Sequence, residues 1–213
     1  MLVRFWMTKD PATIGPQTGA AEALGLMQER KFRRLPVVEG GELVGIITDA
    51  NLTSALQYYA GRFDKARQKR DFSAILVRNI MTPSPFTVRP DTSVAEAARL
   101  MQDRKIGGLP VVEKGRLVGI ITESDIFRAL LGVLGFDLPG MPVTFLLPHD
   151  PDELHEVMRL VKARNLKTHA MATIRDYSPA QCMVMLHVEG EGVAGFLDDL
   201  RSRRIEILSV EGA

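Results

Sequence analysis

"LVGIITDANL" occupies residues 43–52, and "LVGIITESDI" repeats it at residues 117–126 with four changes. A shift of 74 residues lays residues 3–52 on residues 77–126 without a gap, and 28 of these 50 positions are identical. Chance does not produce such a match, so the first part of the chain is an internal duplication. Because about fifty residues bury little surface alone, we expect the copies to pack as one domain with pseudo-two-fold symmetry.

Each copy begins with an extended segment and a helical pattern. The extended segment ends in a Thr-aliphatic pair, Thr13-Ile14 or Thr87-Val88. The helical pattern places apolar residues at i, i+3, i+4 and i+7. In the second copy, Ser93 and Glu96 add a capping-box signal at the helix start.

The second half of each copy predicts a hairpin and another helix. The runs "LPVVE" and "LVGIIT" are rich in β-branched residues, and two turn-forming residues separate them, Gly40-Gly41 or Lys114-Gly115. A helix is expected to follow, with Thr48 or Thr122 as its N-cap. The predicted order in each copy is β-α-β-β-α.

The last third of the chain has a different pattern. A Gly- and Pro-containing stretch predicts a linker over residues 133–141. Residues 142–213 then read as β-α-β-β-α-β, the ferredoxin-like order. The predicted fold class is therefore α/β (more strictly α+β): one duplicated domain followed by a smaller ferredoxin-like domain.

Composition excludes several classes of protein. The net charge is +1 and the apolar content is 46%, so neither nucleic acid nor a membrane is expected as a partner. One cysteine rules out an internal disulfide, and the four histidines show no metal-ligand spacing. Motifs of hydrolases, P-loop proteins and Rossmann enzymes are absent. We therefore expect a non-catalytic protein that needs no cofactor or metal, and a cytoplasmic location in the absence of a targeting signal.

The stretch "MTPSPFTVRPDTSVAEAARLMQDRKIGGLPVVEKGRLVGIITESDIFRAL", residues 81–130, resembles a CBS motif, and the earlier copy resembles its partner. Together they resemble a CBS pair, or Bateman module. The predicted segments are CBS motif 1 over residues 1–60, a connecting segment over 61–76 and CBS motif 2 over 77–132. The resemblance implies a regulatory protein that binds adenine nucleotides in clefts between the motifs.

The helix start at Thr122 is the main candidate site. Unpaired N–H groups and the helix dipole favour phosphate there, and a carboxylate can accept two hydrogen bonds from a ribose diol. The CBS resemblance implies that Asp125 holds the ribose and that Thr122 contacts phosphate. The structural alternative is a well-capped helix start with no ligand.

The first copy departs from this pattern, because Asn51 stands where the second has Asp125. An amide keeps one acceptor oxygen and carries no charge, so the Asn51 cleft is expected to be the weaker or empty one. Loss of one charge-assisted hydrogen bond costs about 1.5–3 kcal/mol. Thr48, Asn51 and Thr87 complete the candidate nucleotide-binding residues.

A second difference between the copies precedes "LPVV", where Arg33-Arg34 face Gly107-Gly108 in the alignment. The resemblance implies that Arg34 reaches nucleotide phosphates and that the glycines leave room for a ligand or a close backbone approach. In the alternative, both arginines are solvated and the glycines stop the helix.

Residues 142–213 resemble an ACT domain, a fold that often binds amino acids or other small effectors at dimer interfaces. Asp150 and Pro151 fit its first loop, but Asp152 stands where a Gly is expected, which makes effector binding there doubtful. Two CBS motifs followed by an ACT-like domain resemble AcuB-type acetoin utilization proteins.

The resemblances imply a sensor of AMP, ADP, ATP or S-adenosylmethionine that regulates an unknown enzyme, in acetoin or related carbon metabolism. They also imply a homodimer. Two alternatives stay open: a ligand-free homodimeric scaffold, and a small-effector sensor that acts through the ACT-like domain.

Overall fold

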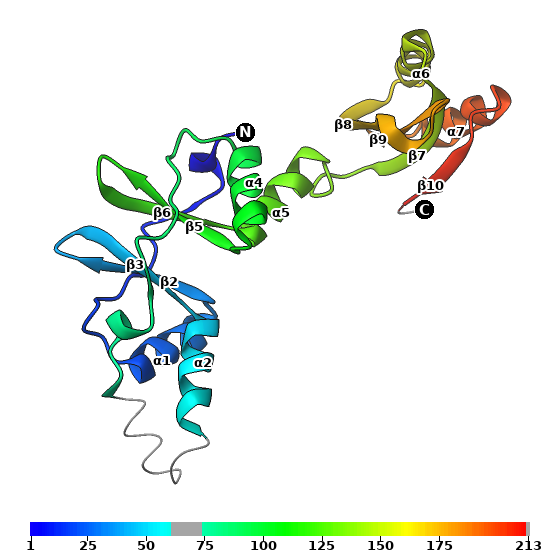
Figure 1. The fold of residues 1–213 in the computed structure, drawn as a ribbon. Coiled ribbons are helices and arrows are strands. Elements are labelled where there is room, and N and C mark those ends of the chain that lie inside the picture. The colour runs from blue at the N-terminus through cyan, green and yellow to red at the C-terminus, as the bar shows by residue number, and fades with distance from the viewer. Residues whose placement is uncertain (61–73, 212–213) are drawn as a thin grey trace. The chain divides into compact units, whose positions relative to one another are not determined.

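The computed structural model describes residues 1–60 and 74–211. The chain forms two compact units, Met1–Ile126 and Phe127–Ala213 (Figure 1). The predicted connecting segment, 61–76, lies largely outside the described residues, and the other predicted segment boundaries stay predictions. Each unit is described by itself below.

Two matching hairpins form the centre of the first unit. The first consists of β2 (Arg34–Glu39) and β3 (Glu42–Thr48), the second of β5 (Gly108–Glu113) and β6 (Arg116–Thr122). All four residues of the two turns have positive φ, as a two-residue type I′ turn requires. Each hairpin has a register shift at the same place, after Val37 and after Val111. The predicted hairpins are confirmed.

Two helices accompany each hairpin: α1 (Ala20–Arg30) and α2 (Asp49–Ala60) in the first copy, α4 (Val94–Arg104) and α5 (Glu123–Val133) in the second. The predicted capping box is confirmed, since Ser93 Oγ accepts a hydrogen bond from the Glu96 N–H at 3.0 Å. The predicted apolar stripes are buried at Ala20, Ala23 and Met27 and at Val94, Ala97 and Met101.

The first segment of each copy pairs with the other copy. Strand β1 (Thr8–Lys9) pairs with β6, and strand β4 (Thr82–Pro83) pairs with β3. The preceding 3₁₀ turns, η1 (Val3–Phe5) and η2 (Val77–Asn79), follow the same rule. The Val3 N–H donates to Thr92 O at 2.9 Å, and the Val77 N–H donates to Thr18 O at 2.8 Å. The two copies are therefore joined by a reciprocal exchange.

This exchange completes both hydrophobic cores. Val77 is fully buried in the core of the first copy, with Ala20, Ala23, Met27, Leu35, Val37, Ile47 and Leu52. Val3 is fully buried in the core of the second copy, with Val88, Ala97, Met101, Leu109, Val111 and Ile121. Each copy thus buries a valine supplied by the other.

The glycine of "LVGIIT" accommodates the exchanged segment. A Cβ at Gly119 would lie 2.5 Å from Met7 Sδ, and a Cβ at Gly45 would overlap the thioether of Met81. Both methionines precede the exchanged strands β1 and β4. The repeated Met-Thr pair and the repeated Gly therefore serve one contact, formed once in each copy.

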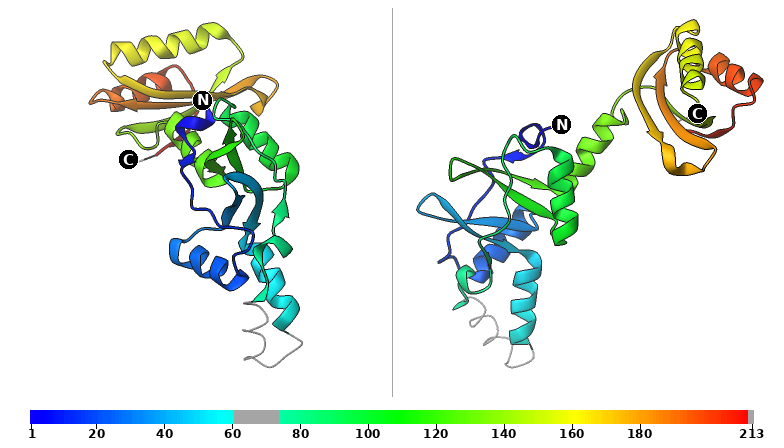
Figure 2. Two further views of the ribbon diagram at one scale, coloured as in Figure 1. Left: turned by 90° about the vertical axis from the view of Figure 1, so that its left-hand side faces the viewer. Right: turned by 45° about the horizontal axis from the view of Figure 1, so that its top comes forward.

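The second unit has the predicted ferredoxin-like topology. Its elements are β7 (Met141–Pro148), α6 (Pro151–Ala163), β8 (Lys167–Ile174), β9 (Gln181–Glu189), α7 (Val193–Ser202) and β10 (Ile207–Val210). The antiparallel strands lie in the order β10-β7-β9-β8, which is 4-1-3-2 in the numbering of a βαββαβ unit. Helices α6 and α7 pack on one face of the sheet (Figure 2).

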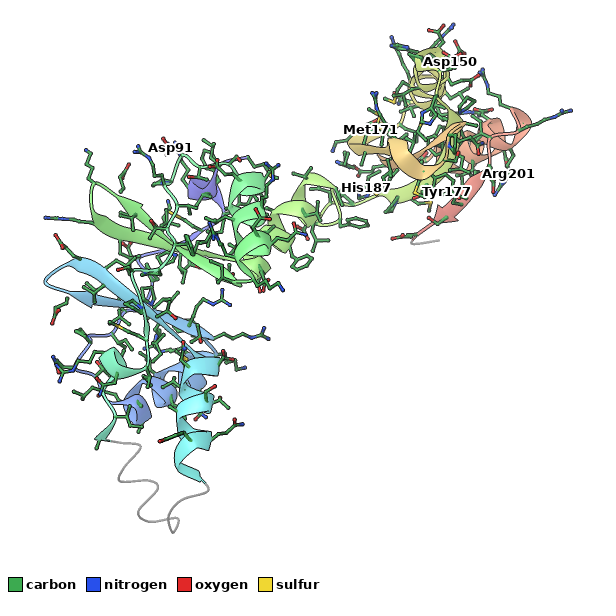
Figure 3. All side chains as sticks on the ribbon, in the orientation of Figure 1. Asp91, Asp150, Met171, Tyr177, His187 and Arg201 are labelled. Carbon is green, nitrogen blue, oxygen red and sulfur yellow. The ribbon has the colours of Figure 1, made fainter. Side chains whose placement is uncertain are left out.

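Alternation along β9 separates the two faces of this sheet. Val184, Leu186 and Val188 belong to the core beneath α6 and α7. His187 points to the other face, near the residues that precede β7 (Figure 3). Its side chain is only 2% exposed, and neither ring nitrogen has a hydrogen-bond partner among the described residues.

Because the valines are exchanged, truncating the valine of one copy should leave a cavity in the core of the other copy. Val77→Ala should lower the free energy of unfolding by about 1.5–3 kcal/mol, because it removes two buried methyl groups from the first copy's core. Urea denaturation measures the loss. Native-state hydrogen exchange should show it first in β2 and β3, whereas Val3→Ala should affect β5 and β6.

The matched control is Val133→Ala, at a residue that is 50% exposed, which should change stability by less than about 0.5 kcal/mol. If Val77→Ala changes stability no more than this control, the exchanged segment does not support the core.

Candidate functional site

The start of α5 is organised by Asp125. Its Oδ2 accepts two hydrogen bonds from Thr122, from the backbone N–H at 2.8 Å and from the hydroxyl at 2.7 Å. The side chain is only 3% exposed, and with His187 it is one of the two polar side chains found buried in the described part of the chain. A buried carboxylate needs such donors, because desolvation without them is costly.

The start of α2 has the same geometry with an amide. Asn51 Oδ1 accepts from the Thr48 N–H at 3.0 Å and from the Thr48 hydroxyl at 2.7 Å. The Asn51 N–H also donates to Thr48 Oγ1 at 3.2 Å, which completes a reciprocal cap. Asn51 therefore reproduces the capping oxygen of Asp125. The chemical difference is the other group: an NH₂ donor in Asn51 and a second carboxylate oxygen in Asp125.

The same hydrogen bonds constrain the predicted role of Thr122. Its hydroxyl proton is donated to Asp125, so the hydroxyl offers a phosphate no donor in this arrangement. A phosphate contact would require the hydroxyl to turn away from the carboxylate. Thr48 is held in the same way by Asn51.

Arg34 lies beside the start of α5, although it belongs to the first copy. A Cβ at Gly108 would overlap the Arg34 guanidinium, and a Cβ at Gly107 would lie 2.6 Å from Arg34 Nη2 and 2.8 Å from Glu123 Oε2. The absence of side chains at Gly107 and Gly108 is therefore what admits Arg34. The space beside Gly107 and Gly108, which the sequence predicted for a ligand or a close backbone approach, is occupied by the Arg34 guanidinium.

The electrostatics of Arg34 reflect this position. Burial lowers the pKa of its guanidinium, and the carboxylates of Glu123 and Asp49, the first residues of α5 and α2, oppose that shift. Arg34 Nη1 is buried and makes no hydrogen bond within the part of the chain that the structure describes. A buried charged donor without a partner is unfavourable, so an added acceptor would stabilise it.

The alternative that both arginines of the Arg33-Arg34 pair are solvated holds for only one of them. Arg33 is exposed, as expected for a solvated side chain, whereas Arg34 is half-buried. The interpretation of Gly107-Gly108 as a helix stop is wrong. Helix α4 ends at Arg104, Lys105 takes the left-handed conformation with φ 53°, and β5 begins at Gly108.

Thr87 lies elsewhere in the second copy. It lines an open hollow of about 700 Å³ with residues of α4 and of the β5–β6 turn, and the lining of this hollow includes none of Arg34, Thr122 and Asp125. The structure thus brings Arg34 close to Gly108, the strand partner of Thr122, and to Glu123 at the start of α5. Thr48 and Asn51 form a separate matching pair, and Thr87 lies in a different environment. Sequence reasoning identified Arg34 but not the glycines as its support.

Other chemistries find little support in the described residues. Across residues 1–60 and 74–211, no three His, Cys, Asp or Glu side chains lie where they could hold a metal ion. In the same ranges, no helix has both the length and the apolar character that a membrane span requires. Cys182 is a free, half-buried residue at the start of β9.

Solved structures with similar folds include CBS pairs with bound ligands. CBSX2 of Arabidopsis thaliana, solved in complex with AMP, is 34% identical with a TM-score of 0.52, over 61% of this chain and 96% of that one. The CBS pair of MJ0100, solved with 5′-methylthioadenosine and S-adenosyl-L-methionine, is 30% identical with a TM-score of 0.53, over 62% and 97%.

A third structure, described as a putative acetoin utilization protein (AcuB) from Vibrio cholerae, is 29% identical with a TM-score of 0.54, over 64% of this chain and 95% of that one. A CBS domain-containing protein of Dictyostelium discoideum is 37% identical over 63% of this chain and 94% of its own length.

Longer relatives are matched only in part. The chain spans 49% of MJ1225 from Methanocaldococcus jannaschii and 23% of the inosine-5′-monophosphate dehydrogenase of Korarchaeum cryptofilum. The similarity to this enzyme is confined to a minor part of its length and transfers no reaction to this chain. The family model for the CBS domain matches residues 3–58 and 77–132, the two copies found by internal comparison. The chain belongs to the CBS-domain family, with its duplicated unit as a CBS pair.

Proposed function

We propose that the protein is a non-catalytic sensor that binds an adenine nucleotide at the α5 site, which consists of Arg34, Thr122 and Asp125. The observation that carries this proposal is Arg34, a half-buried guanidinium with an unpaired donor beside the start of a helix. Anionic phosphate is the ligand group that satisfies both the guanidinium and the helix N-terminus.

Asp125 supplies the second half of the recognition. Its carboxylate lies in the first turn of α5, where a ribose diol can donate to it while the phosphate meets Arg34. Bound phosphate would draw Arg34 from Gly107 and Gly108, which changes the contact between the two copies. Ligand binding would thus be coupled to the packing of the CBS pair, and the α2 site, Thr48 with Asn51, would bind more weakly.

The named ligands of the relatives support the class of ligand. AMP is bound by CBSX2, and S-adenosyl-L-methionine and 5′-methylthioadenosine are bound by the MJ0100 pair. For this chain the candidates are AMP, ADP, ATP and S-adenosylmethionine. The likeness to the Vibrio cholerae protein supports a role in acetoin or related carbon metabolism, through an enzyme that the protein regulates in the cytoplasm.

The second unit is proposed to be an ACT-like domain that transmits the signal. The order 4-1-3-2 of its sheet is compatible with this assignment. The Asp150 carboxylate caps α6 by accepting from the Asp152 N–H at 3.0 Å, so the loop expected to bind an effector is used as a helix start. This favours a signalling or docking role over effector binding.

A homodimer is proposed from the surface of α5 and the turn after it. Phe127, Leu130 and Leu131 are 66%, 49% and 45% exposed, and with Leu134 they follow the i, i+3, i+4, i+7 spacing of one helix face. An exposed apolar stripe of this kind is typical of a protein–protein interface.

Asp125→Asn tests the ribose contact without disturbing the cap, since Asn51 shows that an amide oxygen caps equally well. The loss of a charge-assisted hydrogen bond of about 1.5–3 kcal/mol should weaken AMP binding by roughly 10- to 150-fold. Isothermal titration calorimetry measures the dissociation constant. Asn51→Asp, the reverse change in the other copy, should leave the affinity of the α5 site unchanged.

Equal affinity of the wild type and Asp125→Asn would contradict the ribose role. If AMP, ADP, ATP and S-adenosylmethionine all give neither heat nor a thermal shift with the wild-type protein, the sensor proposal fails, because a ligand that binds the native state must stabilise it. The ligand-free scaffold would then remain.

Asp125→Ala should behave differently from Asp125→Asn in the absence of any ligand. Truncation removes the acceptor of both Thr122 hydrogen bonds, so the free energy of unfolding should fall by about 1–3 kcal/mol. Asp125→Asn should lose less than about 1 kcal/mol. Chemical denaturation compares the two variants, and an equal loss in both would mean that the carboxylate charge, rather than the cap, stabilises the helix start.

Leu130→Asp tests the proposed dimer. A charge in the middle of the apolar stripe should raise the dimer dissociation constant at least about tenfold, because it would bury an unpaired carboxylate. Analytical ultracentrifugation over a concentration series reads this out. Val133→Asp, the same change of one charge at a 50% exposed residue outside the stripe, serves as the charge-matched control. A wild-type protein that stays monomeric at all concentrations would rule the dimer out.

A further inference from the structure

The hollow lined by Thr87 is a second candidate site, separate from the α5 site. Its volume of about 700 Å³ lies within the roughly 300–1,000 Å³ typical of small-molecule sites. All of its lining residues belong to the second copy, to α4, to the segment before α4 and to the β5–β6 hairpin. Its lining residues are Thr87, Val88, Arg89, Thr92, Glu96, Arg99, Leu100, Asp103, Val112, Lys114 and Gly115.

The duplication provides a control for this hollow within the same chain. Eight of the eleven lining positions carry an identical or closely similar residue 74 positions earlier. The other three change in the same sense: Arg89, Arg99 and Lys114 correspond to Gly15, Gly25 and Gly40 in the first copy. All three differences therefore introduce a cation where the other copy has no side chain.

A solvated helix face does not account for these cations. Arg99 is on α4, but Arg89 belongs to the loop before α4 and Lys114 to the β5–β6 turn, so three separate parts of the fold direct positive charge to one hollow. Like charges placed close together repel one another, and a bound anion relieves that repulsion.

Among the described residues, one of the three cations has an ion-pair partner. Arg89 Nε pairs with Asp91 Oδ1 at 3.1 Å (Asp91 is labelled in Figure 3). The side chains of Arg99 and Lys114 make no hydrogen bond or ion pair with any described residue. The lining holds three cations and the two carboxylates of Glu96 and Asp103, and Asp91, outside the lining, offsets Arg89. In the first copy, Glu29 pairs instead with Arg30 at 3.6 Å, and the three positions that correspond to the cations are glycines.

We propose that this hollow binds a small metabolite through an oxyanion group, phosphate or carboxylate, held by Arg99 and Lys114. The Thr87 hydroxyl is an additional donor at the wall, and Val88, Leu100 and Val112 supply an apolar surface for the rest of the ligand. Guanidinium and ammonium groups are the side chains best suited to such anions. The site is independent of the nucleotide site proposed above.

The test uses ¹⁵N-labelled full-length protein, with inorganic phosphate and acetate titrated separately at constant ionic strength. Chemical-shift changes should saturate at residues 87–100 and 112–115 and should be absent at residues 13–26 and 38–41. The response to phosphate against that to acetate identifies the preferred oxyanion. Shift changes spread evenly over all basic surface residues would overturn the proposal, because they would indicate nonspecific ion binding.

Charge-neutral variants identify the binding residues. Arg99→Gln with Lys114→Gln should weaken the saturating response by about tenfold or more. Arg30→Gln with Lys31→Gln, an exposed basic pair of the first copy, is the matched control and should change nothing. Retained affinity in the Arg99/Lys114 variant would overturn the assignment. Asp125→Asn should leave the phosphate response intact, so failure of the nucleotide site is distinguishable from failure of this one.

The first copy also permits a gain-of-function test. A Cβ at Gly25 or Gly40 would meet nothing within 4 Å, and at Gly15 only Thr18 Oγ1 at 3.9 Å. Gly40 has φ 59°, close to the 50° that Lys114 adopts. Gly15→Arg, Gly25→Arg and Gly40→Lys together should create a second saturable response at residues 13–26. A folded triple variant without this response would show that the cations do not form the site.

Discussion

The burial of Val3 and Val77, each in the core of the opposite copy, is the constraint on which the first unit depends. Neither copy can assemble a complete core from its own residues, because the valine that closes each core belongs to the other copy. The strand pairs β1–β6 and β4–β3 hold those segments in place. Folding of one copy therefore requires the other, and the pseudo-symmetry is a consequence of packing as well as of sequence.

The two copies share one backbone arrangement and differ at their candidate sites by only a few atoms. Asp125 and Asn51 share the capping oxygen and differ in a single group, so the helix starts are alike while one carries a second carboxylate oxygen and the other an NH₂ group. Arg34 and Gly108 occupy equivalent positions, and the absence of a side chain at one admits the guanidinium of the other. Each asymmetry is therefore local, and neither disturbs the hairpins beneath it.

Local patterns in the sequence were sufficient for the elements of the fold. The two turns, the Ser93 cap and the order of the second unit follow from short-range backbone preferences and from periodicity. The exchange of β1 and β4 was not predictable in this way, because the two similar copies offer each segment two equivalent hairpins. The contact of Arg34 with Gly107 and Gly108 was not predicted for a related reason: it joins the two copies, and no local spacing encodes it.

A chain with a single copy would meet the same requirement by pairing with a second chain, since β1 would find its hairpin only there. The duplicated protein thus corresponds to a domain-swapped dimer fused into one polypeptide. Fusion replaces a bimolecular encounter by an intramolecular one, with an effective concentration on the order of millimolar for a short tether. Fusion also allows the two copies to differ in sequence. A carboxylate, a guanidinium or a cluster of cations can then be present in one copy and absent from the other.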